Sequence, residues 1–282
     1  MSNVKCQMVF AVAAICMLAL VGCQPPRRPD PTPLCPGKAT IHTAAAALAQ
    51  QRDLLTPLQA TADCVIAWDN SGRREPVDAA QVRFVPPDKL FFRGVRFGEI
   101  RFGANEDEFW LRIKPELDTY WYGTRDQAKQ CSHLLPLNPA GLAEALGVVE
   151  VDTQWGLTHR DGRDILTQRG DSGRPLKRVY VNACNYRVER IEYFDPGAQV
   201  TAATELSGYT PVGDGPTVPT TIRLTTFFQG QVESSATFTL RQIRRFEPTE
   251  QQMQSLFDRP GRDGYKTVLR LDEACNFVEE IR

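Results

Sequence analysis

Residues 86–113 read PPDKLFFRGVRFGEIRFGANEDEFWLRI, and this stretch decides the fold class. Its aromatic and aliphatic residues gather in short runs, and each run is followed by a break that contains glycine or several polar residues. Short runs of this kind, separated by a few turn-forming residues, predict β-hairpins. We therefore expect consecutive antiparallel strands at 89–95, 99–102 and 108–113.

The same pattern extends in both directions along the chain. Strands are expected at 64–68 and around 119–122, and a second series follows beyond residue 160. In two strands of that series, 220–228 and 235–243, the large apolar residues occupy alternate positions, which predicts one apolar and one polar face. The remaining strands of the second series are expected at 165–167, 177–183, 186–194, 199–206 and 265–271.

Three segments predict helices. Residues 40–58 place apolar side chains at helical spacing, and Asn138 is expected to cap a short helix that ends at Gly147. Thr249 begins a third helix through a capping pair with the glutamine three residues later. The largely polar segment 150–171 is interpreted as an insertion.

The first 22 residues predict a bacterial lipoprotein signal peptide. Their apolar run is about 14 residues long, which is shorter than the roughly 20 residues that a membrane-spanning helix needs. Residues 20–23, LVGC, are similar to a lipobox, so Cys23 is the expected site of acylation by chains such as palmitate. An ordinarily cleaved leader with an incidental cysteine is the alternative. Residues 23–39 are interpreted as a proline-rich tether and residues 40–282 as the folded domain.

The composition excludes several classes of function. With 33 Lys and Arg against 34 Asp and Glu, the chain lacks the positive field that binds nucleic-acid phosphates. An apolar fraction of 42% and a charged fraction of 24% are typical of a globular protein and not of a disordered one. Of the three histidines only His133 lies near another candidate ligand, Cys131, so the sequence predicts neither a metal site nor a cofactor.

The cysteines limit the disulfide pattern without fixing it. In an oxidising compartment an odd number of cysteines can form two bridges and leave one free thiol. The sequence leaves their connectivity open. The cysteines beyond the expected acylation site are Cys35, Cys64, Cys131, Cys184 and Cys275.

No catalytic residue is predicted. Residues 170–175, GDSGRP, are similar to the nucleophile segment of chymotrypsin-type serine proteases. That chemistry requires a histidine base and an aspartate that orients it. None of the three histidines, His42, His133 and His159, lies in a sequence similar to that around the catalytic histidine of these proteases. We interpret residues 170–175 as a polar turn, and we expect that the protein is not an enzyme.

The order of elements resembles that of the lipoprotein-carrier superfamily, which is LolA/LolB-like. A lipobox is followed by a spacer, a helix, consecutive antiparallel strands, a short mid-chain helix and further strands. The most similar stretches are 86–94, 103–110 and 137–147. The resemblance implies a mainly β (α+β) fold, in which a strongly curved antiparallel sheet forms an incomplete barrel and helices cover its open mouth.

A curved sheet with one apolar face must bury that face, either against a dry core or around a ligand cavity. Both readings stay open for each residue of the apolar face. The candidates for lining a cavity are Phe92, Trp110, Leu224, Phe228, Phe238 and Leu240.

Gln24 follows the expected acylation site, where an aspartate would favour retention at the inner membrane, so we expect a lipoprotein that is anchored in the outer membrane and faces the periplasm. The resemblance implies that it would bind lipid or the acyl chains of another lipoprotein as a carrier or acceptor. The alternative is an envelope assembly or stress-sensing module whose partner is an envelope protein.

Overall fold

One 15-stranded sheet dominates the computed structural model, which describes residues 34–68, 73–95, 98–114, 117–131 and 139–280. Contacts group Cys35–Arg282 into one compact unit. The expected signal peptide, the acylation site Cys23 and the capping residue Asn138 lie outside the described residues.

The order across the sheet is β17-β16-β6-β5-β4-β3-β2-β1-β15-β14-β11-β10-β9-β8-β7. All neighbouring strands are antiparallel except β16, which pairs with β6 in parallel. The strands are β1 (Leu58–Trp68), β2 (Arg73–Val85), β3 (Lys89–Val95), β4 (Glu99–Ala104), β5 (Glu108–Lys114), β6 (Thr119–Thr124), β7 (Gly156–Arg160), β8 (Arg163–Arg169), β9 (Pro175–Asn182), β10 (Val188–Phe194), β11 (Val200–Ser207), β14 (Thr221–Phe228), β15 (Gln231–Arg245), β16 (Thr267–Leu271) and β17 (Phe277–Glu279). A separate pair is formed by β12 (Thr210–Pro211) and β13 (Thr217–Val218).

Strand β15 joins the two halves of the sheet, because it pairs with β1 on one side and with β14 on the other. The predicted alternation is present there: Ala236, Phe238 and Leu240 are buried on one face. The expectation of a mainly β fold with a large antiparallel sheet and few helices is confirmed.

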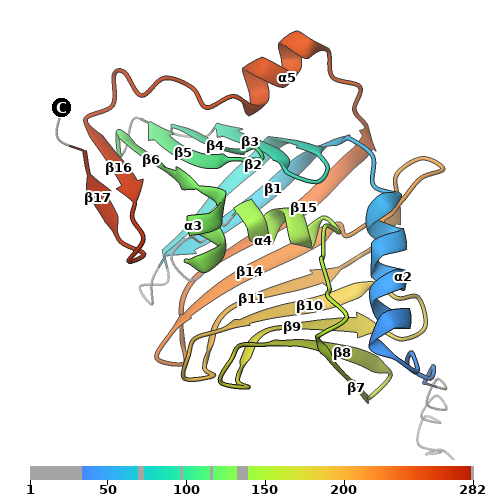
Figure 1. The fold of residues 1–282 in the computed structure, drawn as a ribbon. Helices are drawn as coiled ribbons and strands as arrows, with labels where there is room; N and C mark the ends of the chain where they lie inside the picture. Colours follow the sequence, from blue (N-terminus) through green and yellow to red (C-terminus); the bar gives the residue numbers. More distant parts are fainter. Residues whose placement is uncertain (1–33, 69–72, 96–97, 115–116, 132–138, 281–282) are drawn as a thin grey trace, which may run out of the picture. The chain divides into compact units, whose positions relative to one another are not determined.

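Four helices are described, α2 (Ile41–Asp53), α3 (Arg125–Gln130), α4 (Pro139–Ala145) and α5 (Glu250–Phe257). Figure 1 shows α4 on one face of the sheet and α2 along the ends of β8 to β11. The capping pair predicted for α5 is present, because Thr249 accepts a hydrogen bond from the backbone N–H of Gln252 and the Gln252 side chain accepts one in return.

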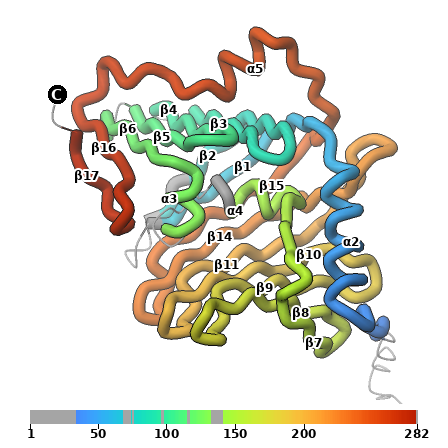
Figure 2. The backbone as a smooth tube through the Cα atoms, in the orientation of Figure 1, coloured from blue at the N-terminus to red at the C-terminus, as the bar shows by residue number. Residues whose placement is uncertain are grey.

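The chain after β15 covers the opposite face of β3 to β6 and ends beside β6 (Figure 2). Phe257 of α5 packs there with Phe91 and Phe246. Both faces of β3 are therefore covered, which explains why the adjacent residues Phe91 and Phe92 are both buried.

Several elements differ from the sequence-based expectations. Strand β2 was not predicted, because Pro76 and several charged residues obscure its alternation; it is held by β1 and β3 on its two sides. Helix α2 ends at Asp53 because Leu58 already begins β1. Most of the segment 150–171, which we interpret as an insertion, forms β7 and β8 at the edge of the sheet.

Candidate functional site

A wholly apolar space lies between α4 and the sheet, and we call it the sheet compartment. It encloses about 310 Å³ of empty volume, part of which is open to solvent. Residues from α4 form one wall, and residues from both halves of the sheet form the other. The lining residues are Val82, Leu90, Phe92, Leu142, Leu146, Ile222, Phe238 and Leu240.

A second space, the α2 compartment, lies on the other side of Leu146, which lines both. Its empty volume is about 410 Å³, again partly open to solvent. Unlike the sheet compartment, it contains polar side chains. It is lined by Leu48, Gln51, Leu55, Glu144, Ala145, Leu146, Gly147, Val149, Val188, Leu206, Tyr209, Thr217 and Pro219.

Helix α4 is apolar except for Glu144, and this carboxylate is bound by the second half of the sheet. Lys177 on β9 donates to it at 2.5 Å, and the phenol of Tyr193 on β10 donates to its other oxygen. The Lys177 ammonium also lies over the rings of Trp155 and Tyr193. Burial, together with the adjacent Glu144 carboxylate, raises the pKa of Tyr193 well above its usual value. These interactions hold α4 in place against β9 and β10.

Three of the six predicted cavity residues lie together in the sheet compartment. The rings of Phe92 and Phe238 meet edge to face with centroids 5.7 Å apart, and Leu240 lies on the same strand as Phe238. Leu224 is buried in the same core without lining either compartment.

The other two predicted residues lie elsewhere. Trp110 is on the opposite face of β5, where it packs with Tyr120, Tyr265 and Val268. Phe228 is 64% exposed at the end of β14, next to the turn into β15. It shares the parity of the buried residues, but the register between β14 and β15 shifts after Thr226, and Phe228 pairs with Gln231 at the turn.

Sequence reasoning missed the contribution of α4. Leu142 and Leu146 were assigned to a helix without being placed in a cavity, and Val82 belongs to the unpredicted strand β2. The apolar character of residues 139–147 was the available signal. No local signal links Glu144 to Lys177, because the two are 33 residues apart.

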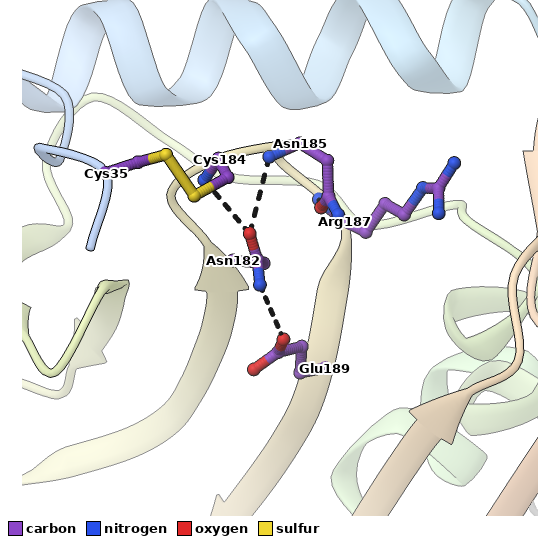
Figure 3. Close-up of a disulfide and its surroundings, with 6 residues drawn as sticks. All are labelled: Cys35, Asn182, Cys184, Asn185, Arg187 and Glu189. Atoms are coloured by element: carbon purple, nitrogen blue, oxygen red, sulfur yellow. Dashed lines mark hydrogen bonds between the residues drawn. A yellow bond between two sulfur atoms is a disulfide. The ribbon is translucent and has the colours of Figure 1, made fainter. Parts of the chain in front are cut away.

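Two disulfides connect distant parts of the chain that the structure describes. Cys35 is bonded to Cys184, and Cys131 to Cys275, while Cys64 is a buried free thiol. Figure 3 shows that Asn182 supports the first bridge: its side-chain oxygen accepts from the backbone N–H of Cys184.

Residues 35–39, which were assigned to the tether, are therefore attached to the folded unit. Besides the Cys35 disulfide, the backbone N–H of Lys38 donates to the buried Asp164 at 2.9 Å. Residues 35–39 therefore belong to the same compact unit as the predicted domain.

The protease-like residues do not form a catalytic triad. His159 lies 3.0 Å from Asp164, but Ser172 is exposed in the turn at the far end of β8. Gly170 is six positions after Asp164 in the chain, which corresponds to about 20 Å of extended strand. Among the described residues, no cluster of three or more His, Cys, Asp or Glu side chains is arranged to hold a metal ion. Within the same part of the chain, no helix has the length and apolar character to cross a bilayer.

The fold is similar to those of three solved bacterial proteins. A domain from Vibrio parahaemolyticus assigned to outer membrane lipoprotein sorting has a TM-score of 0.51 at 14% identity, covering 75% of this chain and 94% of that one. A DUF1329 family protein from Desulfovibrio piger has a TM-score of 0.52 at 11% identity, with 77% and 97% covered. A LolA superfamily protein from Nitrosomonas europaea has a TM-score of 0.47 at 10% identity, with 73% and 96% covered.

The sequence matches no family model and no curated protein. At these identities the likeness to the first two structures concerns the fold alone. The expected resemblance is confirmed for the fold, which this chain shares with the lipoprotein-sorting domain and the DUF1329 family protein.

Proposed function

We propose that this chain is a lipid-anchored lipoprotein of the bacterial envelope that binds the acyl chains of a lipid or of another lipoprotein. It acts as a carrier or acceptor and catalyses no reaction. The binding site is the sheet compartment, and the anchor is the acylated Cys23 in the outer membrane, with the domain facing the periplasm. The observation that carries the proposal is the wholly apolar lining of that compartment.

One side-chain contact across the sheet supports this proposal. Phe92 and Phe238 lie on strands three positions apart in the sheet, which is about 14 Å at the usual strand spacing. Their rings nevertheless touch at 5.7 Å. Side chains of a flat sheet stand perpendicular to it, so this contact favours a sheet that bends toward α4.

The contacts of α4 support the same geometry. This seven-residue helix is about 10 Å long. Its residues line the sheet compartment with β2 and β3, and Glu144 also contacts β9, which is seven strand positions from β3. Seven positions of a flat sheet span about 34 Å. We therefore propose an incomplete barrel wrapped around α4.

In this arrangement α4 fills much of the space that a ligand would use. The enclosed cavity is only about 20 Å³, far below the roughly 300–1,000 Å³ of ligand pockets, and the 310 Å³ of unfilled space around it includes open solvent. Binding of a long acyl chain therefore involves displacement of α4 away from the sheet. Burial of apolar ligand surface favours this binding by about 25 cal/mol for each Å² removed from water.

The disulfides support location in the envelope, since such bridges persist in oxidising compartments. Similarity of fold to a domain assigned to outer membrane lipoprotein sorting supports the choice of ligand.

Mass spectrometry of lipids extracted from the purified chain carrying Cys23→Ser tests the proposal. That substitution removes the expected anchor, so any acyl species recovered is a bound ligand. We expect stoichiometric acyl lipid. Protein that remains free of acyl lipid after incubation with lipid vesicles would contradict the proposal and favour the envelope interaction module instead.

A further inference from the structure

The two compartments beside α4 differ in polarity. All eight residues of the sheet compartment are apolar, whereas Gln51, Tyr209 and Thr217 bring an amide and two hydroxyls to the α2 compartment. Leu146 belongs to both linings. A ligand that extends across Leu146 therefore contacts hydrogen-bonding groups on one side and only apolar groups on the other.

Among the residues that the structure describes, the lining of the α2 compartment contains no cationic group. Glu144 is its one charged lining residue, and the Glu144 carboxylate is already bound by Lys177 and Tyr193. An ionised ligand carboxylate at this position would meet no positive group in the lining, since Arg187, which lies over the Tyr209 ring, is outside it, and it would lie close to a second carboxylate. Both circumstances raise the cost of binding a charged head.

Uncharged hydrogen-bonding groups are available instead. The Gln51 amide makes only a long contact of 3.5 Å, to the carbonyl of Asn185. The Thr217 hydroxyl is half-buried and makes no hydrogen bond within the described part of the chain. The Tyr209 phenol donates to the Val188 carbonyl and keeps its capacity to accept. Ester or amide carbonyls and free hydroxyls match these groups.

We infer that the α2 compartment binds the polar head of the ligand and the sheet compartment its tail, so that the site selects acyl esters and amides with an uncharged head over free fatty acids. This inference rests on the proposed function and specifies the ligand class of the same site. Leu146 marks the point where head and tail regions meet.

Calorimetric titration of the full chain carrying Cys23→Ser compares monododecanoylglycerol with dodecanoate at pH 8, where the latter is ionised. We expect the glyceride to bind about tenfold more tightly or better. Equal or tighter binding of dodecanoate would overturn the inference while leaving the proposed function intact. If neither ligand binds, the proposed function itself fails.

A pair of charge variants on α2 locates the head group. Gln51→Arg adds a cation to the α2 compartment, and Gln50→Arg adds the same charge to the exposed neighbouring residue. We expect Gln51→Arg to tighten dodecanoate binding about tenfold and Gln50→Arg to leave it unchanged. Equal responses of the two variants, with unchanged melting temperatures, would overturn the placement of the head.

Discussion

Lys177 on β9 and Glu144 on α4 form an ion pair with a nitrogen–oxygen distance of 2.5 Å, and only 10% and 20% of their side chains are exposed. The pair connects the one charged residue of α4 to the half of the sheet that is remote from β3. It explains why α4 remains against the sheet although the helix has only seven residues. Breaking the pair leaves the other charge partly buried and unpaired.

Replacing Lys177 alone should destabilise the protein. We expect Lys177→Met to lower the free energy of unfolding by about 2–3 kcal/mol, below the roughly 3–5 kcal/mol of fully buried pairs because Glu144 keeps partial exposure. Denaturant titration measures the change. The double variant Glu144→Leu/Lys177→Met should recover most of the loss, and equal stability of Lys177→Met and wild type would contradict the account of α4.

Two phenylalanines that look alike in the sequence should differ in their effect. Phe238→Ala removes a buried ring that packs on Phe92, which should cost about 3–5 kcal/mol. Phe228→Ala removes an exposed ring at the end of β14 and should change stability by less than about 0.5 kcal/mol. Thermal melts of both variants test this contrast. Similar losses for the two would show that the assignment of the faces is wrong.

The Cys131–Cys275 disulfide should secure the C-terminal segment. It closes 144 residues of sequence separation, for which the loop-entropy relation gives about 5 kcal/mol as an upper estimate. We expect Cys131→Ser/Cys275→Ser to lower stability and to make residues 258–280 sensitive to limited proteolysis. Cys35→Ser/Cys184→Ser is the matched control, since it should release residues 35–38 and leave the C-terminal segment resistant.

The buried Cys64 thiol should make stability depend on alkaline pH. Desolvation raises its pKa to about 12 in the folded state, whereas an unfolded cysteine has a pKa of about 8.5. The unfolded state loses the proton first, so stability falls as pH rises between about 8.5 and 12, by up to about 1.4 kcal/mol per pH unit. Denaturation midpoints at pH 8 and 10 measure the slope. Cys64→Ala should show a shallower slope, and an identical slope would refute this assignment.

Local sequence patterns predicted most of the strands, but they did not predict which elements cover each face of the sheet. Alternation identified β14 and β15 because one face of each is buried and the other is exposed. It failed for β2, where neighbours on both sides override a sequence that contains Pro76. Trp110, a candidate cavity residue, packs with Tyr120 and Tyr265 instead, because the chain after α5 covers the opposite face of β5 and β6.

The candidate site was only partly predictable, because one of its walls depends on contacts between residues that are remote in the sequence. Phe92, Phe238 and Leu240 belong to strands with clear patterns, and the structure places them together. The other wall comes from α4, whose position depends on contacts with β9 and β10 that are remote in the sequence. An apolar site carries no charged motif, so its location follows from topology alone.

Photocrosslinking tests the central claim most directly. A monoacylglycerol with a photoreactive group at the end of its acyl chain is bound to the Cys23→Ser chain, irradiated, and the labelled residues are mapped by peptide mass spectrometry. The account predicts saturable labelling of Leu142, Phe92 and Phe238 around the sheet compartment. Labelling confined to exposed residues such as Phe228, or labelling that does not saturate, would contradict it.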